Sequence, residues 1–218
     1  MILSFIFGVL NVLPNKYRDI QMGGSSVVII LAALTCFTSC LAQDKKESDF
    51  SKEYKTKTGK IICVTETHPI GQSLSTIEIN TKDFEHNYPE KYEDMDPISN
   101  IYMADIDGNG FDEIYIITTS QGSGSFGNVL AFASNRDKSI SQIHFPEMQK
   151  EDKHFQGYMG HDVIKIEDQK LVRIFPIYKD KDSNQNPKGG KRKLIYGLFP
   201  GEAAWQLKIE MSETIHRR

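Results

Sequence analysis

Three glycines in the stretch TTSQGSGSFGNVLAF, residues 118–132, have the spacing of a dinucleotide-binding loop. In that motif the glycines let the backbone approach a pyrophosphate, and the loop must open a helix whose N-terminus holds the phosphates. Here the loop is followed by NVLAFAS, residues 128–134, and then by the turn NRD. No helix long enough for that role fits, so we interpret the loop as the tip of a β-hairpin.

The side chains of this loop suit contact with another protein. Ser123 and Ser125 carry short hydroxyls that both donate and accept hydrogen bonds. Gly124 keeps the loop narrow, and Phe126 adds a flat apolar surface. Such a loop is thin enough to enter a cleft and can donate to carboxylates there. An ordinary flexible β-turn is the alternative interpretation.

A second group of polar side chains lies just upstream, in DIDGNGFDE, residues 105–113. Asp105, Asp107 and Asn109 match the D-x-D-x-[DN]-G pattern of calcium loops, and Glu113 is a further oxygen ligand at the ninth position. An EF-hand also needs a bidentate glutamate at the twelfth position, where the sequence has Ile116. Two hypotheses remain: a single calcium loop between strands, and a tight turn whose Asp and Asn side chains bond their own backbone.

Other chemical signatures are missing from the sequence. The histidines show no zinc-ligand spacing, and neither a Ser/His/Asp set nor a pair of glycosidase carboxylates can be identified. We therefore expect a protein that is not an enzyme and that binds no cofactor, with calcium the one metal left open. A cell-wall enzyme stays a distant hypothesis, without residues to name.

The bulk composition is that of one folded domain with a leader. The chain has 218 residues, of which 39% are hydrophobic and 10% aromatic, and its formal net charge is −3. Nothing in this charge balance calls for nucleic acid as a partner.

Residues 1–40 have the layout of a secretory signal or lipoprotein leader. Lys16 and Arg18 precede the apolar run VVIILAALTCFTSCLAQ, which is too short to span a bilayer comfortably. Cys40 is the candidate for lipid modification; cleavage after Ala42 and an uncut membrane anchor are the alternatives. Cys36 and Cys40 both lie in the leader. Cys63 would therefore be the one cysteine of the mature domain, and no disulfide is expected.

The charged residues 41–58 predict a tether, and residues 59–218 a single domain. Two-residue alternation between turn-forming residues predicts an all-β fold there, a compact antiparallel β-barrel or sandwich of about eight strands. Short helices fit only at 82–95 and 146–156. The candidate strand segments are 60–67, 73–80, 98–104, 113–119, 128–134, 139–145, 162–167, 170–178, 192–199 and 203–210.

Three long stretches together resemble the periplasmic inhibitors of invertebrate-type lysozyme from Gram-negative bacteria. They are ADIDGNGFDEIYIITTSQGSGSFGNVLAFAS (104–134), GYMGHDVIKIEDQKLVRIFPIYKDKDSN (157–184) and GGKRKLIYGLFPGEAAWQLKI (189–209). The resemblance implies an exported antiparallel β domain, periplasmic either in free form or as a membrane-anchored lipoprotein. It also implies inhibition by a Ser-Gly-x-Tyr loop that enters the active-site cleft of lysozyme, which protects the bacterial peptidoglycan against host defence.

The motif of the family falls on Ser123, Gly124, Ser125 and Phe126, with phenylalanine in place of the tyrosine. The resemblance further implies a basic contact residue, for which Arg136 and Lys138 are the candidates. The expected partner is an invertebrate-type lysozyme; a membrane is expected only through the lipid anchor, and a homodimer is left open. The second hypothesis is a calcium-dependent surface or adhesion module that uses the loop 105–113.

Overall fold

The computed structural model describes residues 49–149 and 151–216. The predicted leader, with its lipidation candidate Cys40, and the first part of the predicted tether lie outside the described residues. Within the described ranges there are twelve strands and one short 3-10 helix, and no helix is long and apolar enough to cross a membrane. The elements are β1 (Phe50–Lys55), β2 (Ile61–Thr67), β3 (Ser75–Lys82), β4 (Glu90–Met95), β5 (Ile98–Ala104), β6 (Glu113–Thr119), β7 (Gly127–Ser134), β8 (Ile140–Ile143), η3 (Lys153–Phe155), β9 (Val163–Glu167), β10 (Lys170–Pro176), β11 (Lys191–Pro200) and β12 (Trp205–Ile215).

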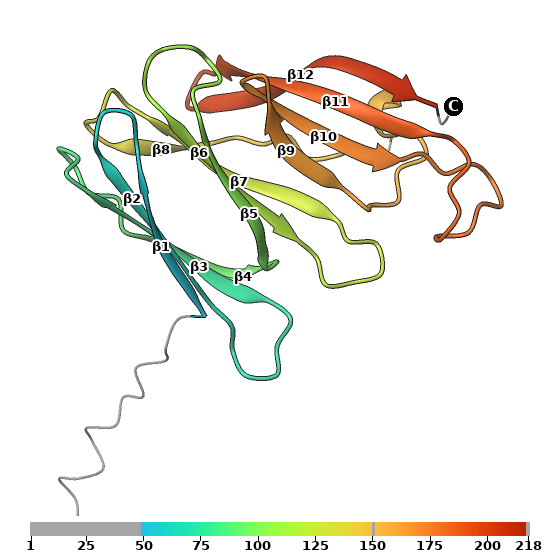
Figure 1. Cartoon of the computed structure of the whole chain (residues 1–218), viewed down its shortest axis with the longest axis horizontal. Coiled ribbons are helices and arrows are strands. Elements are labelled where there is room, and N and C mark those ends of the chain that lie inside the picture. The colour runs from blue at the N-terminus through green and yellow to red at the C-terminus, as the bar shows by residue number, and fades with distance from the viewer. Residues whose placement is uncertain (1–48, 150, 217–218) are drawn as a thin grey trace, which may run out of the picture. The chain divides into compact units, whose positions relative to one another are not determined.

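The strands form three antiparallel sheets of four strands each (Figure 1). The first sheet has the order β1-β2-β3-β4, the middle sheet β5-β6-β7-β8, and the third sheet β12-β11-β10-β9. Within each sheet, every strand therefore pairs with the next one along the chain, which is the arrangement that short turns between strands allow.

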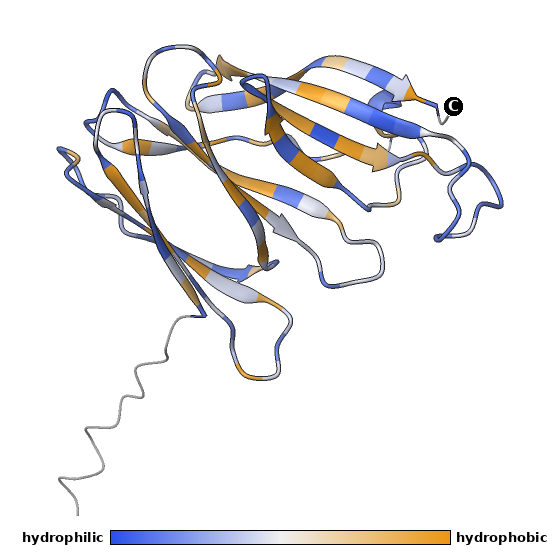
Figure 2. Cartoon of the chain, viewed as in Figure 1, coloured by the Kyte–Doolittle hydropathy of each residue, from blue (hydrophilic) through white to orange (hydrophobic). Residues whose placement is uncertain are grey.

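The middle sheet is buried on both faces. Ile114 and Ile116 of β6 belong to a core shared with β2 and β3 of the first sheet. Tyr115 and Ile117, one residue further on in each case, belong to a core shared with the third sheet. Successive side chains of a strand point to opposite faces, so the run EIYIITT reads as continuously apolar where an ordinary half-buried strand would alternate. Figure 2 shows hydrophobic positions, in orange, on strands of all three sheets.

The all-β, antiparallel sandwich is confirmed, and every candidate segment overlaps a strand. The structure adds β1 and β4, which makes the first sheet a third layer beside the eight strands of the other two. β1 lies within the segment 41–58 that predicted a tether, so the folded part begins earlier than expected. The sequence FSKEYK has no clear strand pattern, because β1 is an edge strand on which only Phe50 and Tyr54 pack against the core.

The two segments expected to hold short helices have different outcomes. Within 146–156 the chain forms the helix η3, capped by the side chain of Asp152, which accepts from the His154 amide. Within 82–95 the chain forms β4, which pairs with β3 through a register shift between Ser75 and Ile77. Tyr92 of β4 packs edge-on against the buried ring of Phe132, and this contact with the middle sheet favours a strand there.

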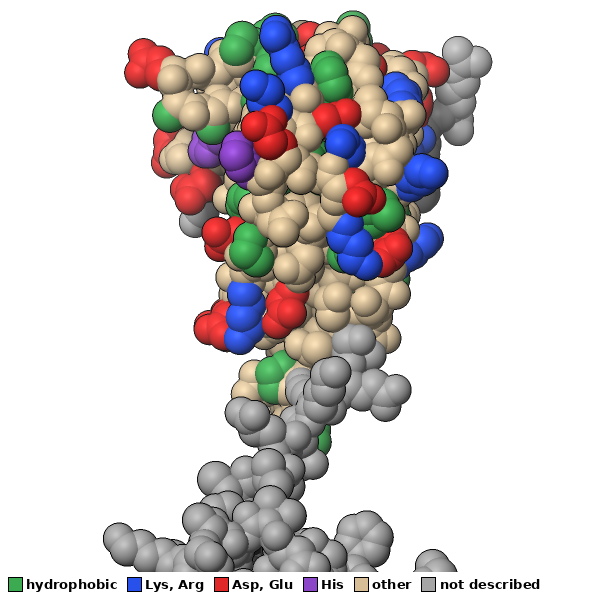
Figure 3. Space-filling view, turned by 90° about the vertical axis from the view of Figure 1, so that its left-hand side faces the viewer, with side chains coloured by type: hydrophobic (Ala, Val, Ile, Leu, Met, Phe, Trp, Pro, Cys, Tyr) green, Lys and Arg blue, Asp and Glu red, His purple; other side chains and the backbone are tan. Residues whose placement is uncertain are grey.

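Charge on one face of the molecule is mixed. Figure 3 shows the side that is on the left in Figure 1, where acidic and basic side chains are interspersed. In the first sheet, Lys82 and Glu53 form an ion pair at 2.5 Å, and Lys91 and Glu93 form another at 2.6 Å. Exposed pairs of this kind contribute little to stability, and no field of a single sign develops on this face.

The two loops singled out from the sequence lie at opposite ends of the middle sheet. The loop 120–126 connects β6 to β7, whereas the loop 105–112 connects β5 to β6. Because the strands are antiparallel, consecutive turns fall at alternating ends (Figure 1). A single binding surface therefore does not include both loops.

Candidate functional site

The finger loop, residues 120–126, is a closed hairpin turn with an exposed tip. Its two ends are joined by hydrogen bonds from the Ser120 amide to the Phe126 carbonyl and from the Phe126 amide to the Ser120 hydroxyl, both 2.9 Å. The Ser125 amide donates to the Gly122 carbonyl at 3.0 Å, and Ser125 has a left-handed backbone with φ of 41°. Ser123 is exposed, and Phe126 keeps 46% of its surface in solvent.

One side of the finger loop is bonded to the segment Gly160–Asp162. The His161 amide donates to the Gly124 carbonyl at 2.5 Å, and the Asp162 amide lies 3.4 Å from the Ser125 carbonyl. Gly160 has φ of +89°, and a Cβ on it would collide with the Gly124 carbonyl. This approach requires glycine at position 160, because any side chain there would push the finger loop away.

Asn184, from the loop that follows β10, also contacts the finger loop. Its side-chain amide donates to the Ser123 carbonyl at 3.2 Å, and its Oδ1 lies 2.9 Å from His161 Nε2. The finger loop is thus supported from two segments far away in the sequence, and it differs in this from the flexible turn considered as the alternative.

The base of the finger loop lies on a buried ion pair. Arg173 Nε lies 2.7 Å from Asp162 Oδ1, and the two side chains are 1% and 0% exposed. Burial alone would lower the pKa of the Arg173 guanidinium, but the hydrogen bond and charge of Asp162 outweigh it, so the pKa is raised. Arg173 therefore stays charged, and its planar fork can bond several acceptors at once.

Two hollows border Phe126. One, of about 830 Å³, has mostly apolar walls that include Met148, Phe155, Tyr158 and Met159. The other, of about 810 Å³, is more polar; among its lining residues are Asn128, His144, Glu147 and Phe145. Phe126 forms part of the wall of both hollows.

The basic candidates Arg136 and Lys138 do not accompany the finger loop. Both are exposed in the turn between β7 and β8. That turn is separated from the finger loop by the length of β7, on the order of 25 Å for a strand of eight residues. The structure therefore does not bring Arg136 or Lys138 to the surface that carries Ser123 and Phe126.

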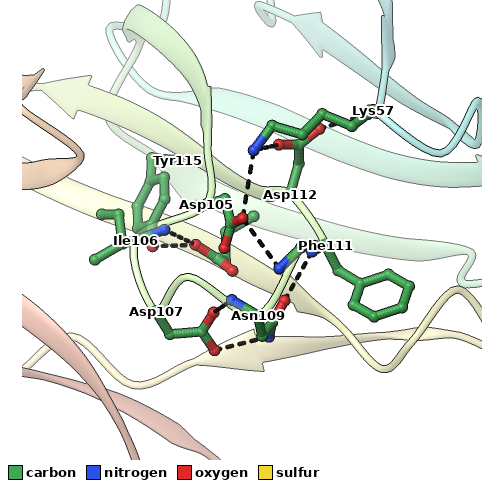
Figure 4. A network of polar contacts seen from close by, with 10 residues as sticks. Lys57, Asp105, Ile106, Asp107, Asn109, Phe111, Asp112 and Tyr115 are labelled. Carbon is green, nitrogen blue, oxygen red and sulfur yellow. Dashed lines mark hydrogen bonds and ion pairs between the residues drawn. The ribbon is translucent and has the colours of Figure 1, made fainter.

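The acidic loop 105–113 folds as a turn held by its own side chains (Figure 4). Asp107 Oδ1 accepts from the Asn109 amide at 3.0 Å, and Asn109 Oδ1 accepts from the Phe111 amide at 2.8 Å. Asp105 Oδ2 accepts from the Gly110 amide at 3.0 Å. These contacts are those of a tight turn bonded by Asp and Asn. The Asn109 oxygen keeps a second lone pair, so the calcium hypothesis stays open.

Three of the four calcium candidates nevertheless meet in space. Carboxylate oxygens of Asp105, Asp107 and Glu113 all lie within 4.8 Å of one another. Asp105 Oδ1 is buried without a hydrogen-bond partner, a feature that costs free energy unless a cation or another donor is added. Lys57 already supplies one positive charge, since its Nζ lies 3.3 Å from Asp105 and 3.2 Å from Asp112.

Glu113 is the most perturbed carboxyl of the acidic loop. Its side chain is buried, and Oε2 accepts from the Ile106 amide at 2.8 Å and from the Tyr115 hydroxyl at 3.2 Å. Burial, only partly offset by these hydrogen bonds, raises its pKa to about 8. Burial and the nearby Asp105 also raise the pKa of Asp107. Burial therefore favours the protonated form of Glu113 within this cluster.

Sequence reasoning missed Asp162 and Arg173, which connect the finger loop to the third sheet. The sequence did contain a signal for them. An arginine in the apolar run LVRIFP is expected to be buried, and a buried charge is costly unless an acidic side chain pairs with it. The glycines around Tyr158 and His161 were a second signal of close backbone approach.

We compared the chain with models of protein families, with curated proteins and with solved structures, and found no match in any of the three. Membership of the lysozyme-inhibitor family stays a prediction from the three quoted stretches.

Proposed function

We propose that this protein inhibits invertebrate-type lysozyme by inserting the finger loop into the active-site cleft of the enzyme. The observation that supports this best is the contrast within the loop. The backbone of residues 120–126 is bonded at both ends and along one side, yet Ser123 and Phe126 face solvent. A loop that is fixed in shape and exposes a hydroxyl beside an aromatic ring is suited to fill a groove in another protein.

The mechanism would be occlusion, with no chemistry on the target. A lysozyme cleft carries catalytic carboxylates and subsites for sugar rings. The Ser123 hydroxyl would donate to one of these carboxylates, a charge-assisted contact of about 1.5–3 kcal/mol. Phe126 would occupy the place of a sugar ring, and Gly124 gives the loop the clearance to reach it. Because the loop is already ordered, little conformational entropy is lost on binding.

Export to the periplasm is part of this proposal, since the target digests peptidoglycan from outside the cell. The support is the leader in residues 1–40, with Cys40 as the lipidation candidate. Mass spectrometry of the purified mature protein distinguishes a lipid-modified Cys40 from a chain that begins after Ala42.

The central experiment titrates the purified protein against invertebrate-type, chicken-type and goose-type lysozymes on a suspension of cell walls. We expect inhibition of the invertebrate-type enzyme, which Ser123→Ala and Phe126→Ala each weaken without lowering the melting temperature by more than a few degrees. Lys55→Ala, an exposed change on β1 of the first sheet, is the control. If both loop variants inhibit as well as the parent, the finger loop is not the inhibitory element.

A second candidate function is a calcium-dependent surface or adhesion module. The observation in its favour is the buried, unpartnered Asp105 Oδ1 beside the carboxylates of Asp107 and Glu113. Calcium prefers oxygen ligands of this kind but needs six or more, so main-chain carbonyls or water would complete the site. This function predicts a melting temperature that rises with calcium and falls with a chelator, whereas the inhibitor needs no metal.

A further inference from the structure

We infer that the buried pair Asp162–Arg173 is a positioning unit, which sets the conformation of the finger loop and thereby its ability to bind. This inference rests on the proposed function. Asp162 and Arg173 are too deeply buried to contact a partner protein themselves, at 0% and 1% side-chain exposure. They act through Gly127, the first residue after the finger loop.

The pair holds both polar groups of the Gly127 backbone. Asp162 Oδ2 accepts from the Gly127 amide at 2.8 Å, and Arg173 Nη2 donates to the Gly127 carbonyl at 3.3 Å. A second contact links the pair to the ring of Phe126, the last residue of the finger loop. The Tyr158 hydroxyl donates to Asp162 Oδ2 at 2.5 Å and accepts from Arg173 Nη2 at 2.8 Å, while the Tyr158 ring packs against Phe126.

The space around this unit is closed. A Cβ on Gly127 would lie 2.9 Å from Asp162 Cβ and 3.0 Å from Ile164 Cδ1, closer than side chains tolerate. The guanidinium of Arg173 also stacks near the rings of Phe155 and Tyr158, at 5.7 and 5.2 Å from their centroids. Hydrogen bonds and close packing thus both fix the position of Gly127, and with it the direction in which the chain leaves the finger loop.

A buried ion pair contributes little net free energy to the stability of a fold. Removing two charges from water offsets most of their mutual attraction, and apolar side chains of similar volume often do as well or better. What an apolar pair cannot do is direct a specific amide and a specific carbonyl. The presence of Asp162 and Arg173 at this one place under the finger loop therefore fits a role in conformation more than a role in overall stability.

The test removes the pair without opening a cavity. In the purified protein, Asp162→Leu is combined with Arg173→Met, and amide exchange is followed by NMR together with lysozyme inhibition. We expect the amide of Leu130, in the middle of β7, to stay protected. The Ser125 and Phe126 amides should exchange at least tenfold faster, and inhibition should weaken by about tenfold or more, since one or two residues must then be ordered on binding.

Matched variants make each result decisive. Lys170→Met with Glu210→Leu removes an exposed ion pair between β10 and β12. Its Nζ–Oε2 distance is 3.0 Å, and both side chains are 36% exposed. This control should change neither the amide exchange nor the inhibition. Tyr158→Phe removes a single hydroxyl and should give a smaller increase in the exchange of the Ser125 and Phe126 amides and a smaller loss of inhibition. If the double variant loses protection at Leu130, Tyr158→Phe serves as the test in its place. Arg173→Lys keeps Asp162 and a positive charge but loses the planar guanidinium that bonds several acceptors. Its amide exchange and inhibition should fall between those of the parent and the double variant.

The inference is overturned if the double variant, or Tyr158→Phe in its place, leaves the Ser125 and Phe126 amides unchanged. It is also overturned if inhibition persists at parental strength while these amides exchange faster, since the conformation would then not matter. A parent protein that inhibits no lysozyme contradicts the proposed function instead, and the amide exchange still tests the positioning of the loop.

Discussion

The ring of Phe126 packs edge-on against the ring of Tyr158, with centroids 5.8 Å apart and an interplanar angle of 63°. Aromatic pairs in this geometry contribute about 0.5–1.5 kcal/mol beyond the area that they bury. One side of the Phe126 ring is thus fixed by the protein, and the other side stays available to a partner. The same contact links the exposed ring of Phe126 to Asp162, to which the Tyr158 hydroxyl donates.

Phe126→Tyr should strengthen inhibition of invertebrate-type lysozyme. The lysozyme inhibitors that the sequence resembles have tyrosine at this place, and the added hydroxyl offers one more hydrogen bond inside the cleft. A net gain of about 0.5–1.5 kcal/mol corresponds to an inhibition constant roughly 2- to 12-fold lower. Inhibition titrations of parent and variant side by side measure this. An inhibition constant higher than that of the parent would mean that the ring enters an apolar subsite.

Gly160→Ala should weaken inhibition, because its Cβ would collide with the Gly124 carbonyl and displace the finger loop. The left-handed backbone at position 160 adds strain, so we also expect unfolding to become easier by about 1–3 kcal/mol. Gly122→Ala is the control from the finger loop itself, since a Cβ there meets nothing within 4 Å. Denaturant melts and inhibition titrations measure both effects; equal behaviour of the two variants would argue against the close approach.

Arg136→Ala and Lys138→Ala, alone or together, should leave inhibition unchanged. The lysozyme-inhibitor resemblance implied a basic contact residue here, but the turn between β7 and β8 is at the far end of the middle sheet from the finger loop. A loss of more than about threefold in the double variant, more than an exposed charge contributes through long-range attraction in salt, would show that the enzyme also reaches this end.

The sequence predicted much of this fold because most strands carry their own signal. The run KIICVTET alternates cleanly, and β2 appears there with every second residue buried. The strands β1 and β4 escaped, since FSKEYK and EKYEDM expose most of their side chains and are defined by their neighbours. Local sequence cannot reveal a strand that exists because β2 or β3 offers it an edge to pair with and because a few of its aromatic side chains pack on the core.

The candidate site was predictable only in part, for a related reason. Ser123 and Phe126 were found because glycines around them mark a turn, and the turn is where the pattern placed it. The support from Asp162, Arg173 and Asn184 comes from residues 35 to 61 positions away. Contacts of this range depend on how the third sheet lies against the middle one, which no spacing of residues in the sequence specifies.

Stability should depend on pH through Glu113. Its pKa is about 8 in the folded protein against 4.5 for an ordinary glutamate, so the folded state binds the proton more tightly. The stabilising contribution is therefore fully present below pH 4.5 and is lost as the pH rises to 8, by as much as about 5 kcal/mol at about 1.4 kcal/mol per pKa unit. Glu113→Gln, which keeps an acceptor for the Ile106 amide, should remove most of this slope and leave the smaller part that comes from the raised pKa of Asp107. Denaturant melts from pH 5 to 9 measure it, and an unchanged slope in the variant would assign it to another group.

Calcium and pH together distinguish the acidic loop as a metal site from the acidic loop as a turn. Calcium would have to displace the proton of Glu113, because a carboxylic acid is a poor ligand for the ion. If the site binds calcium, the rise in melting temperature on adding calcium should be small at pH 6 and grow up to pH 9, and Asp107→Asn should reduce it. Asp182→Asn, which alters a turn bonded in a similar way after β10, is the control. If neither calcium nor chelator changes the melting temperature across this range, the charge of the acidic loop is balanced by Lys57 and the proton of Glu113 alone. The loop 105–113 would then serve only to join two strands.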